Sequence, residues 1–386
     1  MRKGWEYKKL GEVCEVVTGT TPKTNIPEYW GKGHYWVTPA ELNDTTVYID
    51  KTERQITDEA LSKTKLRLLP VGTVLLSSRA PIGKVAIANA EMYCNQGFKN
   101  CICSEAIYNK YLFYFLRLKK DYLNSLGRGA TFKEISKSIV ESIKIPLPPK
   151  STQLAIVSEL DKINELIRLK KEQLKDFDNL AQSLFYEMFG DPVENEKGWE
   201  VKKLKDISRE IGDGLHGTPE YSEVDTGCYF INGNNLENGT IVIKENTKMV
   251  SEKTKTKHYI EMDDFTILVS INGTLGKVAF YNGENVILGK SACYIKLEAY
   301  NDKKYIFELL KSDYFKRCAE NECTGTTIRN VSLKSMRNFR CPLPPLPLQR
   351  LFAQRIEQIE REKSEVQKSI QDLETLLASR MQYWFE

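Results

Sequence analysis

Residues 146–189 read PLPPKSTQLAIVSELDKINELIRLKKEQLKDFDNLAQSLFYEMF, and this stretch decides the fold. Prolines disfavour helix upstream and suit its first position, so the Pro-Leu-Pro-Pro signal predicts a helix that begins at Ser151. The residues that follow are amphipathic, with apolar side chains at helical spacing along one narrow stripe. A narrow stripe of this length, with charge on the other faces, is typical of a coiled coil rather than of a helix in a globular core.

A second copy of this stretch begins at Pro342, and matching residues are 196 positions apart throughout (146 to 342). It predicts a second long helix from Pro347, and two such stripes in one chain suggest each other as partners. The seam residues that we expect to pack between the helices are Ile156, Leu160, Ile163, Ile167, Leu174 and Phe177 in the first copy, and Phe352, Ile356, Ile359, Val366, Ile370 and Leu373 in the second.

The repeat extends beyond the helices. Gly-Trp-Glu-x-Lys-Lys-Leu occurs at residues 4–10 and again at 198–204, and each copy is followed by short segments rich in aromatic and β-branched residues. These segments read as strands between turns, and aromatic-rich helices are predicted over 108–126 and 302–319. We therefore predict two similar α/β (α+β) domains with a pseudo-twofold relationship, and two long helices that form an antiparallel coiled coil. The predicted boundaries are 1–145 and 191–341 for the domains, and 146–190 and 342–386 for the helices.

Each predicted domain contains a strand, a polar tight loop and a return strand, at residues 71–86 and 264–279. Gly83-Lys84 and Gly276-Lys277 enter the return strands at equivalent places. This pattern predicts a β-hairpin that presents polar groups at its tip.

The composition restricts the class of protein. Lys and Arg total 56 against 52 acidic residues, and a net charge of +4 does not by itself prove a nucleic-acid partner. The nine cysteines include no Cys-x-x-Cys zinc pattern, which favours reduced thiols. The first residues lack an apolar signal core and no apolar run reaches the roughly 18 residues of a membrane span, so we expect a cytoplasmic protein.

Enzyme motifs are missing from the sequence. Residues 273–277 lack the spacing and the Ser/Thr of a phosphate-binding P-loop. No Asp/Asn-Pro-Pro-aromatic tetrad of a methyltransferase occurs, and His34, His216 and His258 are far apart in the sequence. We expect no catalytic residues and no metal site.

The doubled frame resembles the specificity subunit of type I restriction-modification systems over the whole chain. The features that carry the resemblance are two variable domains alternating with two long helices, each domain opening with Gly-Trp-Glu-x-Lys-Lys-Leu and closing with Pro-Leu-Pro-Pro followed by Gln. One Pro-Leu-Pro-Pro motif alone is a weak signal, whereas the repeated frame is specific.

The resemblance implies that each domain is a target recognition domain that reads one part of a split sequence in double-stranded DNA. It also implies that the helices hold the two domains apart and dock two methyltransferase subunits, and that two motor-nuclease restriction subunits join the complex that defends against phage. In such a complex the chain itself catalyses nothing and binds no cofactor, and S-adenosylmethionine, ATP and Mg²⁺ belong to the partner subunits.

The length of the helices fits this interpretation. A helix of about 40 residues, at about 1.5 Å per residue, spans roughly 55 to 60 Å. Half-sites one helical turn apart are separated by about 34 Å, so such a rod bridges them. Antiparallel pairing brings Glu386 close to Met1, and two different domains predict an asymmetric bipartite target.

Polar residues in the predicted loops are candidate DNA contacts. Lysines after the hairpin glycines suit phosphates, and arginine or asparagine at the tips suits base edges, although solvated tips without a function are the alternative. For the threonine-rich loops and the Gly/Asn turn, ordinary turn chemistry is the alternative. The residues selected as DNA contacts are Thr20, Thr21, Lys23, Ser78, Arg79, Lys84, Asn95, Gln96, His216, Thr218, Asn232, Asn234, Asn272, Lys277 and Lys290.

Each long helix ends in an aromatic group that is wider than the seam. The first group includes Phe185 and Phe189, and the second includes Trp384 and Phe385. Such a group either caps the core of a neighbouring domain or docks a partner subunit.

Two other functions are compatible with the sequence. A specificity chain that serves one fused restriction-methylation polypeptide would share all these features, and neighbouring reading frames would distinguish it. A coiled-coil scaffold whose repeated domains bind protein would show no salt-dependent affinity for duplex DNA.

Overall fold

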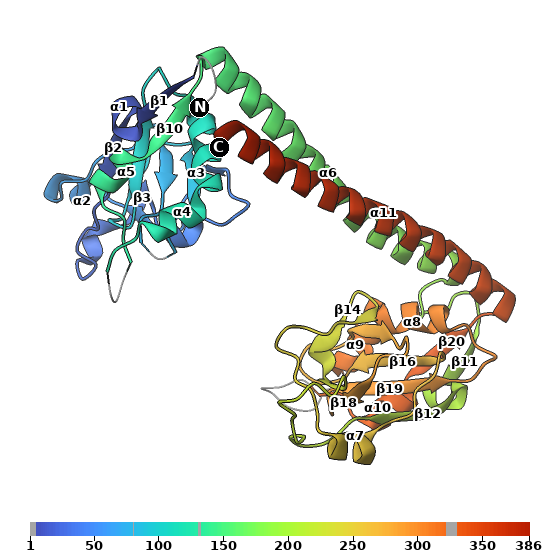
Figure 1. Ribbon diagram of the computed structural model, residues 1–386. Coiled ribbons are helices and arrows are strands. Elements are labelled where there is room, and N and C mark those ends of the chain that lie inside the picture. The colour runs from blue at the N-terminus through green and yellow to red at the C-terminus, as the bar shows by residue number, and fades with distance from the viewer. Residues whose placement is uncertain (1–4, 80, 130–132, 322–329) are drawn as a thin grey trace. The chain divides into compact units, whose positions relative to one another are not determined.

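The computed structural model describes residues 5–79, 81–129, 133–321 and 330–386. Contacts divide the chain into unit 1, which comprises Met1–Lys171 and Lys368–Glu386, and unit 2, which comprises Glu172–Gln367. Each unit therefore contains a globular domain and part of each long helix (Figure 1). The domain boundaries that the sequence suggests, at the ends of the helices, stay a prediction.

Unit 1 is built around a sheet of five strands. Four of its strands pair antiparallel, and the short edge strand β4 pairs parallel with β7. The order across the sheet is β2 (Cys14–Thr18), β9 (Lys99–Cys103), β6 (Val74–Leu76), β7 (Val85–Ala88) and β4 (Tyr48–Ile49). A smaller sheet has the order β5 (Gln55–Ile56), β3 (Trp30–Val37) and β8 (Tyr93–Cys94), and β1 (Glu6–Lys9) pairs with β10 (Lys144–Leu147).

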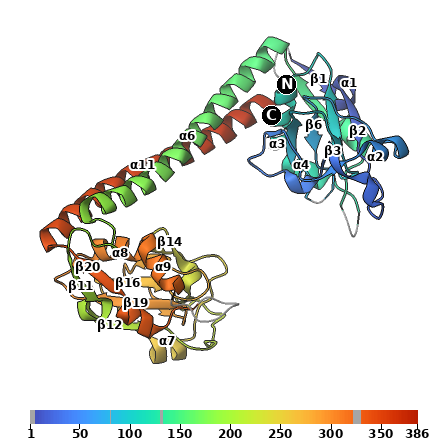
Figure 2. The same ribbon diagram turned by 180° about the vertical axis from the view of Figure 1, so that it is seen from behind.

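Among the helices of the globular part of unit 1, α3 is the longest and the others are short. Helix α3 packs on β6 and β7, and Figure 2 shows it beside β6. The elements are α1 (Leu10–Val13), α2 (Asp58–Lys63), α3 (Asn109–Leu118), α4 (Lys120–Ser125), α5 (Lys137–Ser142) and the 3-10 turns η1 (Pro27–Tyr29) and η2 (Pro39–Glu41).

Unit 2 repeats this plan with four antiparallel strands, in the order β12 (Ser208–Asp213), β19 (Ala292–Leu297), β16 (Thr266–Ser270) and β17 (Val278–Phe280). The pairs beside it are β13 (Tyr229–Ile231) with β18 (Val286–Leu288), β14 (Leu236–Glu237) with β15 (Thr240–Ile241), and β11 (Glu200–Lys203) with β20 (Arg340–Leu343). The helical elements are η3 (Leu204–Ile207), η4 (Gly233–Asn235), α7 (Glu252–His258), α8 (Lys303–Lys311), α9 (Asp313–Asn321) and α10 (Leu333–Asn338).

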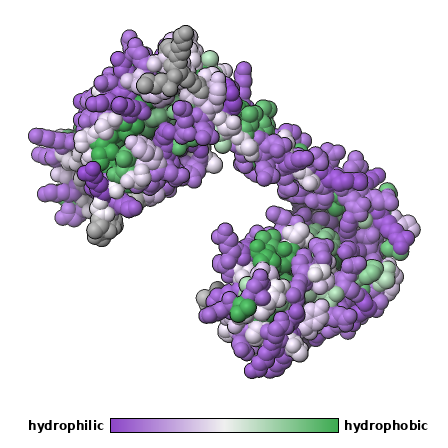
Figure 3. All heavy atoms as spheres, viewed as in Figure 1, coloured by the Kyte–Doolittle hydropathy of each residue, from purple (hydrophilic) through white to green (hydrophobic). Residues whose placement is uncertain are grey.

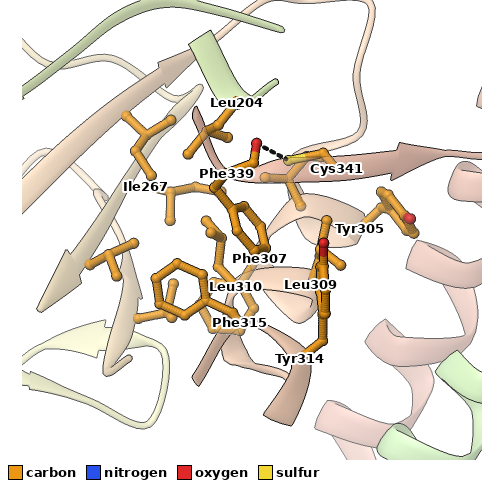
Figure 4. Packing of buried hydrophobic residues seen from close by; sticks show 14 of the residues in the cluster. Leu204, Ile267, Tyr305, Phe307, Leu309, Leu310, Tyr314, Phe315, Phe339 and Cys341 are labelled. Atoms are coloured by element: carbon orange, nitrogen blue, oxygen red, sulfur yellow. Dashed lines mark hydrogen bonds between the residues drawn. The ribbon is translucent and has the colours of Figure 1, made fainter. Parts of the chain in front are cut away.

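The core of unit 2 lies between its sheet and α8 and α9. Figure 4 shows Ile267 of the sheet near Phe307, Leu310 and Phe315 of the helices. These side chains are at most 6% exposed. Hydrophilic residues cover most of the visible face of each unit, with smaller hydrophobic groups among them (Figure 3).

The aromatic-rich helices differ from the prediction, because each is broken into two. The first breaks at Lys119, between α3 and α4, and the second breaks at Ser312, between α8 and α9. Ser312 is extended (ψ 159°), and its hydroxyl accepts a hydrogen bond from the N–H of Phe315 at 3.4 Å. A serine that caps the next helix in this way competes with helix continuation.

The two long helices are α6 (Lys150–Phe189) and α11 (Leu346–Phe385), and each begins one residue before the predicted position. In unit 1, Lys171 of α6 pairs with Glu374 of α11 at 2.7 Å, and Glu159 pairs with Arg380. Residue numbers rise along one helix as they fall along the other, so the segments are antiparallel.

The helix segments in unit 2 pair in the same sense. Asp178 of α6 lies 2.9 Å from Lys363 of α11, and Met188 lies 3.9 Å from Arg355. The predicted fold class, α/β units with an internal repeat and long helices that pair antiparallel, is confirmed.

Burial of the predicted seam residues is uneven along the helices. Nine are at most 8% exposed: Ile156, Leu160, Ile163, Ile167, Phe352, Ile356, Ile359, Val366 and Ile370. Leu174, Phe177 and Leu373 are half-buried. Ile156 and Leu160 join the core of unit 1, and Phe352 and Ile356 join that of unit 2, so the start of each helix packs on its globular domain as well as on the other helix.

Candidate nucleic-acid interface

A serine organises the hairpin of unit 1. The Ser77 hydroxyl donates to the carbonyl of Pro81 at 2.8 Å and accepts from the N–H of Lys84 at 2.9 Å. Gly83 has a φ of +89°, a conformation that glycine adopts readily and other residues rarely. Local hydrogen bonds therefore fix the place where Lys84 emerges.

Ser270 forms the same arrangement in unit 2. Its hydroxyl donates to the carbonyl of Thr274 at 2.5 Å and accepts from the N–H of Lys277 at 2.9 Å. Gly276 has a φ of +72°. The structure thus presents Lys84 and Lys277 from equivalent hairpin positions.

The two lysines have different surroundings. The Lys84 ammonium donates to the carbonyl of Pro39 at 3.2 Å. The Lys277 ammonium lies 3.9 Å from the carboxylate of Glu237, and the Lys277 side chain is 31% exposed. Both remain partly accessible, and each ammonium retains donors for a further acceptor.

Two candidate loops of unit 1 meet. The Thr20 N–H donates to the carbonyl of Cys94 at 3.0 Å, and the Thr21 hydroxyl donates to the side chain of Gln96. Asn95 accepts the N–H of Gly97 at 2.9 Å, which is the turn chemistry considered as its alternative role. Lys23, on the same loop as the threonines, is exposed.

Ser78 requires a correction, because it is fully buried. Its hydroxyl accepts from the ammonium of Lys99 at 3.3 Å, and Lys99 is itself only 5% exposed. The Ser78 side chain is therefore covered by protein in this structure, and we assign it to the packing beneath the loops. The sequence does not indicate whether a serine hydroxyl near a hairpin tip points inward or outward.

Arg79 lies beside this buried lysine. Its guanidinium and the Lys99 ammonium contact the same carboxylate, Glu134, at 2.9 and 3.0 Å. Burial opposes ionisation of Glu134, but the hydrogen bonds from Lys99 and Arg79 outweigh it and hold the pKa of this carboxyl below its usual value. Any contact of Arg79 with DNA competes with this ion pair.

In unit 2, three candidates from different segments line one hollow of about 440 Å³: His216, Asn272 and Lys290. The His216 ring lies 2.8 Å from the carboxylate of Asp213, at the end of β12. The backbones of Asn272 and Asn330 form an isolated antiparallel β-bridge, and Lys290 is exposed. Thr218 is also exposed but does not line this hollow.

A second hollow of unit 2, of about 420 Å³, brings together Asn232, Asn234 and Lys277. The Asn232 side-chain oxygen accepts from the hydroxyl of Ser291 at 3.0 Å, which ties it to the segment that carries Lys290. Asn234 is exposed. The roles of these residues in DNA binding stay predictions.

Two residues that sequence reasoning missed lie beside these loops. Arg54 of unit 1 stacks on Trp30, and Lys248 of unit 2 lies over Tyr221. Each cation is far from its aromatic partner in the sequence, and strand pairing and long turns bring the two together. The sequence therefore gives no periodic signal for either pair.

The described residues include no cluster of His, Cys, Asp and Glu that could hold a metal ion. No helix in this part of the chain is long and apolar enough to cross a membrane.

The repeated frame is matched by a model of the type I restriction modification DNA specificity domain, over residues 2–176 and again over 196–375. The chain belongs to this family. Like the structure, the family model divides the chain into two copies of one unit.

Relatives of this specificity protein carry corresponding descriptions. The type I restriction enzyme MjaIX specificity subunit of Methanocaldococcus jannaschii is 31% identical, over 91% of this chain and 85% of the relative. The MjaVIII specificity subunit of the same organism is 23% identical, over 97% of this chain and 92% of the relative. Both matches extend over both units.

A solved structure gives the same fold. It concerns complex assembly and conformational transition of the type I R-M system, and one of its chains superposes on this specificity protein with a TM-score of 0.67. The match covers 99% of this chain and 97% of that chain at 19% identity, so it bears on the fold alone.

Proposed function

We propose that this chain is the subunit that gives a type I restriction-modification system its DNA specificity, and that each unit reads one half of an asymmetric bipartite target in double-stranded DNA. One observation carries the proposal. The two hairpins share the same serine, glycine and lysine framework, whereas Arg79 in one tip corresponds to Asn272 in the other.

This combination suits DNA recognition for a physical reason. Contacts to phosphates position a protein on the duplex without regard to sequence, whereas contacts to base edges specify the sequence. A lysine retained in both frames suits the first task, and the different tips suit the second. Asparagine is the characteristic partner of adenine and arginine that of guanine.

Partner subunits supply the chemistry in this proposal. Two methyltransferase subunits and two restriction subunits assemble with the chain in the cytoplasm, and they bind S-adenosylmethionine, ATP and Mg²⁺. The chain itself positions these enzymes and catalyses nothing. A specificity chain that serves a fused restriction-methylation polypeptide would position its enzyme in the same way.

The proposal is tested by co-expressing the chain with the methyltransferase subunit of its system in a host that lacks both. Single-molecule sequencing of the host genome then reports methylated bases. We expect one new split motif with two different halves, and a genome without new methylation contradicts the proposal. A protein-binding scaffold would also lack the steep dependence of duplex affinity on salt that we expect.

A further inference from the structure

An exposed cation lies over a pair of aromatic rings in unit 1. The guanidinium carbon of Arg54 is 3.8 Å from the ring centroid of Trp30 and 5.3 Å from that of Trp36. The two indoles meet edge to face, with centroids 4.8 Å apart. Stacking on aromatic faces orients a guanidinium and leaves its N–H groups available.

Unit 2 contains a similar arrangement made from different residues, with the cation over one ring of the aromatic pair. The ammonium of Lys248 is 4.7 Å from the ring centroid of Tyr221, which meets Phe230 edge to face at 6.2 Å. No residue type is shared between the two groups. Both units therefore place a cation over the first ring of an edge-to-face aromatic pair, although the side chains differ.

The backbone places both cations in the same way. The N–H of Trp36 donates to the carbonyl of Arg54 at 3.2 Å, and the N–H of Phe230 donates to the carbonyl of Lys248 at 2.9 Å. In each unit the residue that carries the cation thus pairs through its backbone with the second aromatic residue. That aromatic residue lies on the strand that leads into the 3-10 turn η2 or η4.

Both groups adjoin the candidate loops. The indole N–H of Trp30 donates to the carbonyl of Lys23 at 3.2 Å, and that of Trp36 donates to the carbonyl of Thr20 at 3.3 Å. In unit 2, Lys248 lines the same hollow as Asn234 and Lys277.

The charges of these two residues are not neutralised locally. Within the described part of the chain, neither Arg54 nor Lys248 forms an ion pair, whereas Arg79 and Lys244 are paired with carboxylates. Both Arg54 and Lys248 are exposed. An oriented cation without a carboxylate partner is suited to an anionic ligand.

We propose that Arg54 and Lys248 each bind a phosphate of the duplex DNA backbone and position their unit on it independently of base sequence. The inference rests on the proposed function and adds a phosphate site to each unit. The aromatic rings hold the side chain ready, so less conformational entropy is lost on binding. An arginine also offers two parallel N–H groups to a phosphate.

The test uses the full chain in complex with its methyltransferase subunit, and the variants Arg54→Gln, Lys248→Gln and the double variant. Fluorescence anisotropy gives the Kd for a duplex with the methylated motif and for an unrelated duplex, at several salt concentrations. We expect each single variant to weaken binding to both duplexes by a similar factor, about threefold to tenfold at low salt. The slope of log affinity against log salt is negative. It should become less steep by about 0.9 for each site removed.

Two matched controls separate this effect from a general loss of positive charge. Arg67 pairs with Glu15, which lies near the start of β2, and Arg209, which lies near the start of β12, pairs with Asp263. The candidate loops follow the other ends of these two strands. Arg67→Gln and Arg209→Gln should leave affinity and slope unchanged. Arg54→Lys keeps the charge and should therefore keep the salt slope. If Arg54→Gln fails to fold, Lys248→Gln in unit 2 still tests the inference.

Unchanged affinity and slope in folded Gln variants would overturn the inference, and so would a change in the methylated motif, which would assign these residues to base reading. If the unsubstituted complex itself shows no salt-dependent affinity for duplex DNA, the proposed function fails instead.

Discussion

Phe385 of α11 packs against Tyr111 of α3, with ring centroids 5.0 Å apart. Phe189 of α6 makes the equivalent contact with Tyr305 of α8, at 4.8 Å. The aromatic end of each long helix therefore closes the core of one unit, which supports the capping role considered for these groups. Docking of a partner subunit stays a prediction. Near the same end of α11, Trp384 stacks on Trp5 at 6.2 Å and Glu386 pairs with Lys119. Met1, expected close to Glu386, lies outside the described residues.

Phe385→Ala should destabilise unit 1 strongly, because the side chain is 4% exposed and its loss leaves a cavity. We expect a decrease of about 3 to 5 kcal/mol in the free energy of unfolding. Ser379→Ala, on an exposed position of the same helix, should change it by less than about 0.5 kcal/mol. Chemical denaturation measures both variants, and equal stability of the two would contradict the capping role.

A second prediction concerns the buried glutamine that follows each Pro-Leu-Pro-Pro motif. Gln153 is fully buried, accepts from the N–H of Tyr108 at 2.8 Å and donates to the carbonyl of Pro148 at 2.9 Å. Gln153→Ala leaves these backbone groups unpaired, which should cost about 1 to 3 kcal/mol in unfolding free energy. Gln371→Ala, on an exposed position of α11, should be nearly neutral when measured in the same way.

The ion pair between Glu159 and Arg380 predicts a pH dependence. The hydrogen bond from Arg380 holds the pKa of Glu159 below its ordinary value of 4.5. A carboxyl with a lowered pKa in the folded state stabilises the fold above its unfolded pKa, and this contribution is lost as the pH falls through the folded pKa. Glu159→Gln should therefore lower the Tm at neutral pH, with a difference from the unsubstituted protein that shrinks in acid. A difference that persists at pH values below both pKa values would show that the effect is not electrostatic.

The hairpin glycines should respond unequally to alanine. A Cβ on Gly83 would lie 3.3 Å from the backbone of Lys120, whereas on Gly276 the nearest atom is a flexible side-chain carbon of Lys316, also at 3.3 Å. Both positions have positive φ, so each substitution should cost about 1 to 2 kcal/mol, and Gly83→Ala should cost more. Thermal unfolding ranks them, and the reverse order would contradict the assigned packing.

The doubled Pro-Leu-Pro-Pro signal and the apolar stripes were sufficient to predict the long helices and their antiparallel pairing. The polar loops with Gly83-Lys84 and Gly276-Lys277 predicted the repeated hairpins. These signals work because proline and glycine act through local backbone geometry, which the sequence states directly. The break at Ser312 was missed, since a serine inside an amphipathic pattern caps a helix only when the tertiary structure supports the turn.

The candidate site was less predictable, because its residues meet through tertiary contacts that the local sequence does not indicate. Loop residues such as Thr21 and Gln96 can be selected by type, but their meeting depends on contacts between distant segments. Arg54 and Trp30 give no local signal, because the pairing of β3 with β5 brings them together. The burial of Ser78 depends on Lys99, from another strand.

The central claim is that each unit reads its own half of one split target. It is tested most directly by replacing residues 1–145 with the corresponding domain of another specificity subunit, and by sequencing the methylated genome of a host that expresses the hybrid with the methyltransferase subunit. We predict a motif in which one half is new and the other half is unchanged. Changes in both halves, or in neither, would contradict the claim.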